Sequence, residues 1–409
     1  MPVGMANFPQ MPRIEGLRLG TAMSGIKTAQ RRDLVVIEVP EGATVAGTFT
    51  RNAFCAAPVT VAREHLQACR LRDAAPRYLV INTGNANAGT GEVGMRDARA
   101  TCAELAGLVD VDESAVLPFS TGVIGETLPM DRLLAGLPAA LRGLDDGTAG
   151  WQAAAEGILT TDTRPKGASL TIAMGDETVT INGISKGSGM IQPNMATMLG
   201  FVATDAAIPP GVLDELLREA VDHSFNCITV DGDTSTNDAC MLIATGSGPA
   251  VDDPQRLAVF RDGLQRVMNE LAQAIVRDGE GATKFVTLQV DGAVTRQEAL
   301  DVAFTVAHSP LVKTAMAASD ANWGRILAAV GRAPVVDFDV SRVTIDLGSV
   351  RLVEQGGRAP GYTEEAGSEV MAQEEIGIRI DLARGQRAAT VWTTDLTREY
   401  VAINADYRT

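Results

Sequence analysis

Hydrophobic positions in the first two hundred residues fall mainly into short segments separated by Gly, Asn and Pro. Within these segments apolar and polar residues alternate with a period of two, and β-branched residues are frequent, which is typical of strands. Strands are predicted at residues 34–39, 44–50, 77–84, 168–174 and 178–183. A helix is predicted over residues 95–108, and the Leu-rich stretch 125–151 predicts helices with turns.

Longer helices are predicted after residue 200. The stretch that Pro209 and Pro210 open, 212–225, places its leucines on one face of a helix. Two further amphipathic helices are predicted over 255–277 and over 297–316, the latter with a break at Pro310.

The chain becomes β-rich again from residue 334 onward. Strands are predicted at residues 335–340, 342–347, 376–382 and 389–394, with a charged loop over 358–375. Together these elements predict a mixed α/β fold with several antiparallel strands, divided near residues 183–200 and near residue 285.

Charge and composition exclude several classes of protein. The chain has 409 residues, 51 Asp and Glu against 35 Lys and Arg, and a net charge of −16. A field of that sign repels phosphate backbones and anionic lipid headgroups, so we expect neither a nucleic-acid nor a membrane partner. No apolar run approaches the ~20 residues of a membrane span. Because the N-terminal residues lack the layout of a secretory signal, we expect a soluble, cytoplasmic protein.

Cysteine and histidine offer little chemistry. The five cysteines are widely spaced without a C-x-x-C pair, so neither a disulfide framework nor a zinc site is indicated, and no metal is expected. The three histidines are interpreted as structural, and an enzyme that needs a histidine base would have to use one of them.

Two glycine- and aspartate-rich segments partly match known binding loops. Residues 89–94 fit G-x-G-x-x-G, but four residues separate them from the preceding strand, so a glycine-rich turn is favoured over a dinucleotide site. Residues 231–238 begin like a calcium loop. However, the sixth position is Thr236 where such a loop has glycine, and the twelfth is Leu242 where it has glutamate. A turn that hydrogen-bonds its own backbone is favoured there.

The segment from Lys186 to Leu199 is the richest in candidate functional residues. It follows a strand and contains small residues, Pro193 and, directly before an apolar strand, Thr197. The Thr197 hydroxyl at such a junction can attack the carbonyl of Ala196, and an N→O shift with hydrolysis would then make Thr197 a new N-terminus. Its α-amine, with an ordinary pKa of about 7.7–8.0, can serve as base for its own hydroxyl. A glycine-rich loop that enters a strand is the alternative interpretation.

This segment closely resembles the self-processing junction of the ornithine acetyltransferase family, the glutamate N-acetyltransferases of arginine biosynthesis. The resemblance extends from about residue 20 to residue 409 through motifs that occur in the family's order. These motifs are residues 82–88, 120–125, 160–166, 231–238, 280–284, 320–325, 394–396 and 400–407.

The resemblance implies a precursor that cleaves itself between Ala196 and Thr197. The products would be an α-chain of residues 1–196 and a β-chain of residues 197–409, assembled as a heterotetramer of two α- and two β-chains. The implied fold is the α/β sandwich of the self-processed aminopeptidases. Residues 197–284 would complete the catalytic domain and residues 285–409 would form a C-terminal α/β domain.

The resemblance also implies a reaction and roles for individual residues. Acetyl would pass from N-acetylornithine to glutamate through an acetyl ester on Thr197. Thr121 and Gly122 match the family's oxyanion pair. Residues that match its substrate-binding positions are Thr160, Lys186, Thr197, Glu280, Asn404 and Thr409. As hypotheses, Lys186 would bind a carboxylate and Glu280 an ammonium group.

Three alternatives and one further question stay open. An aminopeptidase or amidohydrolase with the same N-terminal threonine would transfer the acyl group to water, whereas the Lys186 and Glu280 pair suits an amino-acid acceptor. A dinucleotide enzyme using residues 89–94 and a non-catalytic binding module are the other two. No resident cofactor is expected, and no motif decides whether acetyl-CoA also donates acetyl.

Overall fold

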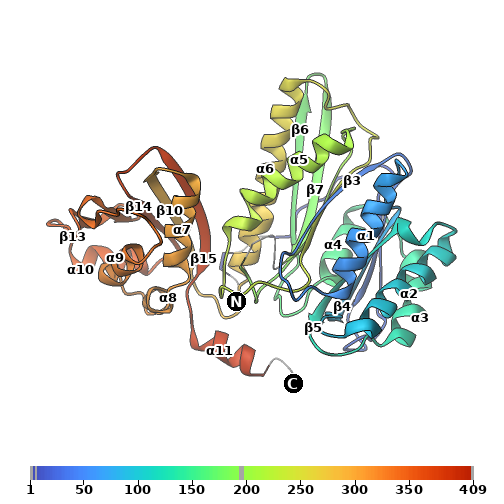
Figure 1. The fold of residues 1–409 in the computed structure, drawn as a ribbon, viewed down its shortest axis with the longest axis horizontal. Coiled ribbons are helices and arrows are strands. Elements are labelled where there is room, and N and C mark those ends of the chain that lie inside the picture. Colours follow the sequence, from blue (N-terminus) through green and yellow to red (C-terminus); the bar gives the residue numbers. More distant parts are fainter. Residues whose placement is uncertain (1–2, 5–6, 193–197, 407–409) are drawn as a thin grey trace. The chain divides into compact units, whose positions relative to one another are not determined.

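The computed structural model describes residues 3–4, 7–192 and 198–406. These residues form two compact units (Figure 1). The larger unit comprises residues 7–226 and 233–275, and the smaller one comprises residues 227–232 and the chain from Val276 onward, together with the first residues of the chain.

The first sheet of the larger unit has the strand order β1-β2-β4-β5. Only β4 and β5 are parallel, so their carboxyl ends lie at the same edge. The bounds of its strands are β1 (Arg18–Ala22), β2 (Leu34–Glu38), β4 (Tyr78–Asn85) and β5 (Val116–Val123).

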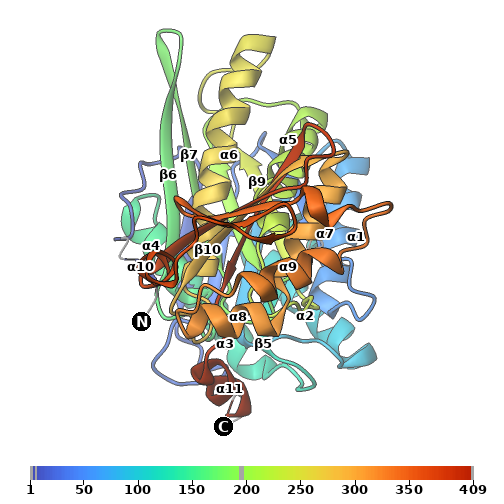
Figure 2. The same ribbon diagram turned by 90° about the vertical axis from the view of Figure 1, so that its left-hand side faces the viewer.

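The second sheet of this unit has the order β3-β9-β8-β7-β6 and places β8 in the centre. The strands β8 and β9 are parallel, and β6 and β7 form the long hairpin that Figure 2 shows beside α6 (Pro254–Arg277). The bounds are β3 (Thr44–Phe49), β6 (Lys166–Met174), β7 (Glu177–Lys186), β8 (Leu199–Thr204) and β9 (Ala239–Ala244).

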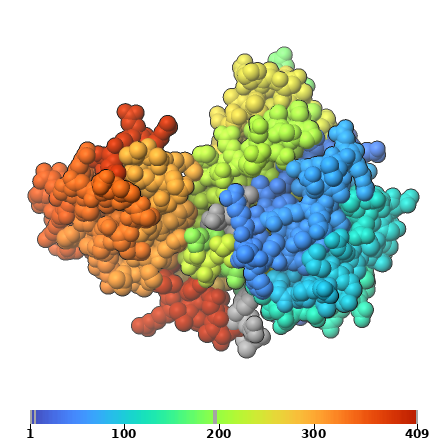
Figure 3. Space-filling view, viewed as in Figure 1, coloured from blue at the N-terminus to red at the C-terminus, as the bar shows by residue number. Residues whose placement is uncertain are grey.

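The two sheets pack face to face over one apolar core. Side chains of β1, β2, β4 and β5 meet those of β3, β7, β8 and β9 in this core, and Phe119 packs edge-on against Phe201 with ring centroids 5.3 Å apart. Figure 3 shows the blue and cyan segments and the yellow-green ones as a continuous body in this unit. The unit is therefore built from chain on both sides of residues 193–197.

Helices cover the outer faces of both sheets. Helices α2 and α3 bury their apolar faces against β2, β4 and β5, whereas α6 lies close to β6 and β7, where Gly183 leaves room for Leu271. The bounds are α1 (Ala57–Leu71), α2 (Gly91–Val109), α3 (Met130–Arg142), α4 (Thr148–Gly157), α5 (Pro210–Asp222) and α6 (Pro254–Arg277). The layers are thus helix, sheet, sheet, helix, and the expected α/β sandwich is confirmed.

The smaller unit is a six-stranded sheet with helices packed on it. The strand order is β13-β12-β11-β14-β10-β15, and a single apolar cluster joins the sheet to helices α7–α10. Strand bounds are β10 (Phe285–Ala293), β11 (Thr344–Leu347), β12 (Val350–Glu354), β13 (Gly357–Arg358), β14 (Glu375–Asp381) and β15 (Arg387–Thr394). Helix bounds are α7 (Arg296–Ala307), α8 (Pro310–Ala317), α9 (Trp323–Gly331), α10 (Glu364–Met371) and α11 (Arg398–Ala405).

Two local predictions for this unit are wrong. Residues 335–340 form turns instead of a strand, because Pro334 precedes them and Asp337 has a φ of +52°. The charged stretch 358–375 is not simply a loop, since it contains α10. That helix begins where the Thr363 hydroxyl accepts a hydrogen bond from Ala366 N, with two glutamates in its first turn.

Candidate active site

Thr121 and Gly122 lie near the carboxyl end of β5, where they pair in register with Thr83 and Gly84 of β4. Gly122 has a φ of +139°, and a Cβ there would lie 2.2 Å from the carbonyl carbon of Gly84. Only glycine therefore fits at position 122. The family motifs 82–88 and 120–125 meet at this edge of the first sheet.

Buried amides hold this edge in place. The Ser120 hydroxyl donates to Asn82 Oδ1 at 2.5 Å, and Asn237 Nδ2 donates to the carbonyl oxygens of Ala86 and Ser120 at 2.5 and 2.9 Å. Because the Asn237 amide bonds the backbone of β5, this part of the aspartate-rich run is structural. Among the described residues, no group of three or more His, Cys, Asp or Glu side chains is arranged to hold a metal ion.

Lys186 is the last residue of β7, and its side chain reaches across to the first sheet. Its Nζ donates a hydrogen bond to Thr121 Oγ1 at 3.1 Å. Its backbone pairs in register with Leu199, the first residue of β8. The strand ends on both sides of the predicted cleavage segment are therefore neighbours. Ala196 and Thr197 themselves lie outside the described residues.

A buried carboxylate, Asp162, joins several predicted residues, although sequence reasoning did not single it out. Its Oδ1 accepts hydrogen bonds from Lys166 Nζ at 2.6 Å and from Gly187 N at 2.7 Å, and its Oδ2 accepts one from Thr160 N at 3.0 Å. The Asp162 and Lys166 side chains are both fully buried. Residues 160–165 form neither helix nor strand, so the spacing of Asp162 and Lys166 along the chain did not reveal this pair.

The charge state of Asp162 follows from its neighbours. Burial would raise the pKa of this carboxyl group, but the nearby charges of Lys166 and Lys186 and the hydrogen bonds from Lys166 and Thr160 N outweigh it. The pKa of Asp162 is consequently held well below its ordinary value, and the group is an anion at neutral pH.

Two more of the predicted residues meet in the smaller unit. Asn404, in α11, donates from Nδ2 to Glu280 Oε2 at 2.8 Å, and Glu280 is buried. Tyr400 in the same helix donates its hydroxyl hydrogen to Asp231 Oδ2 at 3.2 Å. Thr409 lies outside the described residues.

The loop that carries Glu280 is anchored to the carboxyl end of β15. Asp395 Oδ1 accepts hydrogen bonds from Thr283 N and Lys284 N at 2.8 and 3.0 Å. Two residues before Asp395, Thr393 Oγ1 accepts a hydrogen bond from the Lys313 ammonium group at 3.1 Å. Burial lowers the pKa of Lys313 to about 8. The motifs 280–284 and 394–396 are thus parts of one hydrogen-bonded structure.

The glycine pattern at 89–94 is a closed turn. Helix α2 begins at Gly91, and Asn87 Nδ2 donates to the carbonyl oxygen of Gly94 at 2.9 Å. A Cβ at Gly94 would lie 1.9 Å from Thr90 Oγ1, so this glycine is required by local packing. This supports a glycine-rich turn.

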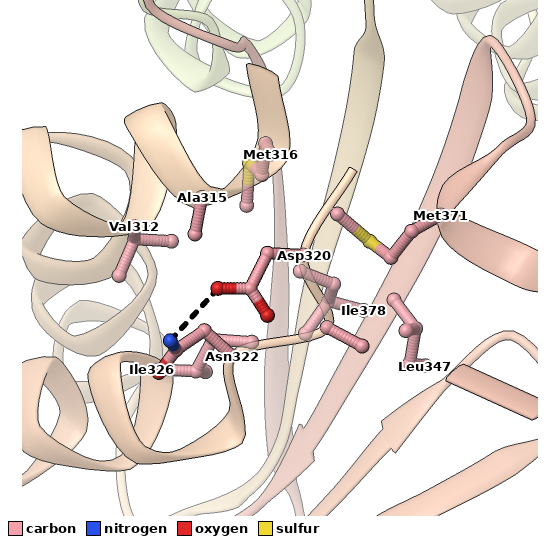
Figure 4. Close-up of a pocket in the computed structure, with 10 residues that line it drawn as sticks. Val312, Ala315, Met316, Asp320, Asn322, Ile326, Leu347, Met371 and Ile378 are labelled. Carbon is pink, nitrogen blue, oxygen red and sulfur yellow. Dashed lines mark hydrogen bonds between the residues drawn. The ribbon is translucent and has the colours of Figure 1, made fainter. Parts of the chain in front are cut away.

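Two cavities lie away from the predicted residues. One, of about 870 Å³, opens at the amino ends of β4 and β5, opposite Thr121, and its Arg70 and Arg72 pair with Asp214 and Asp112. The other, of about 10 Å³, lies beside the motif 320–325 and is lined mainly by apolar side chains (Figure 4). It has room for about one water molecule, so it is too small for a substrate.

Comparisons with known proteins agree with the distribution of motifs. Residues 18–409 match the ArgJ family. The chain belongs to the ArgJ family. It is 55% identical over 413 residues to the arginine biosynthesis bifunctional protein ArgJ of Pseudomonas syringae pv. tomato, with 100% of both chains covered. It is 55% identical over 399 residues to the protein of that name from Methylococcus capsulatus, covering 97% of this chain and 96% of the relative.

A solved structure of an ArgJ protein is also similar to this chain. The Bacillus halodurans ArgJ structure is 38% identical, covers 50% of this chain and 97% of its own, and has a TM-score of 0.48. The resemblance to the ArgJ family that the motifs indicate is confirmed by the full-length relatives. None of the described helices combines the length and apolarity that crossing a membrane requires.

Proposed function

We propose that this chain is a self-cleaving acetyltransferase of arginine biosynthesis, which moves acetyl from N-acetylornithine to glutamate and releases ornithine and N-acetylglutamate. Its membership of the ArgJ family and the full-length relatives named arginine biosynthesis bifunctional protein support the pathway. The main structural support for the proposed site is the hydrogen bond from Lys186 to Thr121, because it joins two predicted site residues that are 65 positions apart in the chain.

In the first step the precursor would be cut between Ala196 and Thr197. The Thr197 hydroxyl oxygen attacks the Ala196 carbonyl carbon, the peptide C–N bond breaks as the amine of Thr197 takes up a proton, and water then hydrolyses the ester. Residues 7–192 and 198–226 lie in one compact unit with a shared core, so the two products would stay associated. We further propose that they assemble as a heterotetramer of two α- and two β-chains in the cytoplasm.

Acetyl transfer would then proceed in two half-reactions. Thr197 Oγ attacks the acetyl carbonyl carbon of N-acetylornithine, its α-amine accepts the hydroxyl proton, and ornithine leaves with a proton as the C–N bond breaks. The glutamate amine attacks the acetyl ester in the second half-reaction and restores the hydroxyl group.

The geometry at Thr121 suits an oxyanion donor. An ammonium group can only donate hydrogen bonds, so the Thr121 oxygen accepts from Lys186 and its own hydrogen is directed elsewhere. With the backbone of Gly122 beside it, this hydroxyl would stabilise the negative oxygen of each tetrahedral intermediate. The positive charge of Lys186 strengthens the same effect.

Substrate recognition is proposed for Thr160, Lys186, Thr197, Glu280, Asn404 and Thr409. Lys186 would bind a carboxylate and Glu280 an ammonium group, which together suit an α-amino acid. The bifunctional name of the relatives also supports acetyl-CoA as a second acetyl donor to glutamate, without a resident cofactor.

The test is to incubate purified chain with N-acetylornithine, with and without glutamate. Ornithine release that requires glutamate, with equal formation of N-acetylglutamate, is the expected result. Equal release without glutamate would instead identify an amidohydrolase on the same scaffold, and no release in either reaction would overturn both.

A further inference from the structure

Lys186 is held from two sides, and one of them involves a group outside the proposed set of site residues. Its ammonium group bonds Thr121, while the amide of the next residue, Gly187, donates to the Asp162 carboxylate at 2.7 Å. Gly187 has a φ of +153°, a conformation that glycine adopts readily. The carboxylate of Asp162 therefore anchors the backbone at the point where β7 ends and the predicted cleavage segment begins.

The same carboxylate also controls the position of Thr160. The backbone N–H of Thr160 donates to Asp162 Oδ2 at 3.0 Å, and its carbonyl oxygen accepts from Arg31 Nη1 at 3.1 Å. Thr160 lies between α4 and β6 and Gly187 follows β7, and their backbone N–H groups donate to the two oxygens of this one buried side chain. A shift of Asp162 would move them together.

Lys166 supplies the counter-charge that keeps Asp162 ionised inside the unit. A buried ion pair contributes little net stability compared with an apolar pair of the same size, because both ions lose their hydration. A structural role alone does not require a charged pair here. Three anchored groups around the carboxylate indicate a role in placing them.

We propose that Asp162 is a positioning residue for acetyl transfer, which sets where Lys186 and Thr160 meet the substrate. This inference rests on the proposed function, since it assigns Lys186 and Thr160 to substrate binding. Asp162 acts through Gly187, Thr160 N and Lys166, and the charged groups that face it are Lys166 from β6 and Lys186 from β7.

Three variants of the full chain test the proposal. Asp162→Asn removes the charge, and Asp162→Asn with Lys166→Met also removes the buried ammonium group that would otherwise lose its counter-charge. Asp205→Asn is the matched control, because Asp205 Oδ1 accepts from Thr180 N at 2.9 Å toward the opposite end of β7. Thermal unfolding, the extent of splitting on a denaturing gel, kcat, KM and the pH profile of kcat/KM are measured for each.

We expect Asp162→Asn to lower kcat/KM for N-acetylornithine by about tenfold or more, largely through KM, since binding groups would be misplaced. The pH profile of kcat/KM should also differ from that of the wild type, because the site loses the negative charge that interacts with Lys166 and Lys186. The double variant should regain the thermal stability of the wild type without regaining kcat/KM, and Asp205→Asn should keep wild-type kinetics.

Two results would overturn the inference. If the double variant regains wild-type kcat/KM and pH profile together with its stability, Asp162 merely neutralises Lys166. If Asp162→Asn folds and matches Asp205→Asn in KM and pH profile, its carboxylate does not position the site. A wild-type chain without glutamate-dependent release of ornithine would overturn the proposed function, and this inference with it.

Discussion

The side-chain amide of Asn404 donates a hydrogen bond to the carboxylate of Glu280 at 2.8 Å, although 124 residues separate the two in the chain. Glu280 is buried, so the amide replaces water that the carboxylate would otherwise bind. This contact places α11 against the loop 278–283, where Thr397 Oγ1 also donates to the carbonyl oxygen of Gly281 at 2.7 Å. Helix α11 is thereby attached to a predicted substrate-binding residue.

The first prediction concerns this pair. Asn404→Ala removes the donor to Glu280, and we expect KM for N-acetylornithine to rise about tenfold, since a hydrogen bond to a charged group contributes roughly 1.5–3 kcal/mol. Steady-state kinetics measure the effect. The control is Glu399→Gln, a change at an exposed position of the same helix that should leave KM unchanged. Equal KM values for both variants would contradict a binding role for Asn404.

The second prediction concerns the hydroxyl group of Thr121. Thr121→Val keeps the shape of the side chain but removes the proposed oxyanion donor, so kcat should fall by about 10²–10³-fold. Thr44→Val is the matched control, because its hydroxyl donates to the Ile208 carbonyl oxygen at 2.9 Å at the far end of the sandwich. A kcat within twofold of wild type for Thr121→Val would exclude this hydroxyl from the transition state.

The third prediction concerns maturation. Thr197→Ala lacks the attacking oxygen and should run on a denaturing gel as one inactive chain of 42.9 kDa, whereas Thr197→Ser keeps a hydroxyl and should still split. N-terminal sequencing of the smaller wild-type band should begin at Thr197. Normal splitting of Thr197→Ala would place the scissile bond elsewhere.

The fourth prediction concerns stability at acid pH. Burial, with the charges of Lys313 and Arg332 nearby, lowers the pKa of His308 to about 4, against an opposing effect of Asp231. Between pH 6.5 and 4 the unfolded chain therefore binds a proton that the folded chain does not, and the free energy of unfolding falls as the pH falls. His308→Gln should flatten the dependence of Tm on pH in this window.

The control for that measurement is His223→Gln, because His223 is exposed. It should keep the wild-type slope of Tm against pH. A His308→Gln variant whose slope equals that of wild type would contradict the stated effect of burial on His308.

Elements whose signals are local could be predicted from the sequence alone. The period-two segments became β2, β3, β6 and β7, and the amphipathic stretches became α5 and α6. The break expected at Pro310 separates α7 from α8, and there the Ser309 hydroxyl caps the second helix. Such signals depend on neighbours within a few residues, so they can be read without tertiary structure. The family motifs likewise followed from residue order alone.

Other elements could not be predicted from local sequence patterns. Strands β9 and β10 and helix α1 were not predicted, since β9 is an uninterrupted buried segment whose period does not distinguish strand from helix. The candidate site depended even more on tertiary structure. Lys186 contacts Thr121, and Asp162 contacts Gly187, only because the order and register of the strands bring together residues at or next to the ends of different strands. Pairings of this kind depend on contacts between distant residues, which no period along the chain encodes.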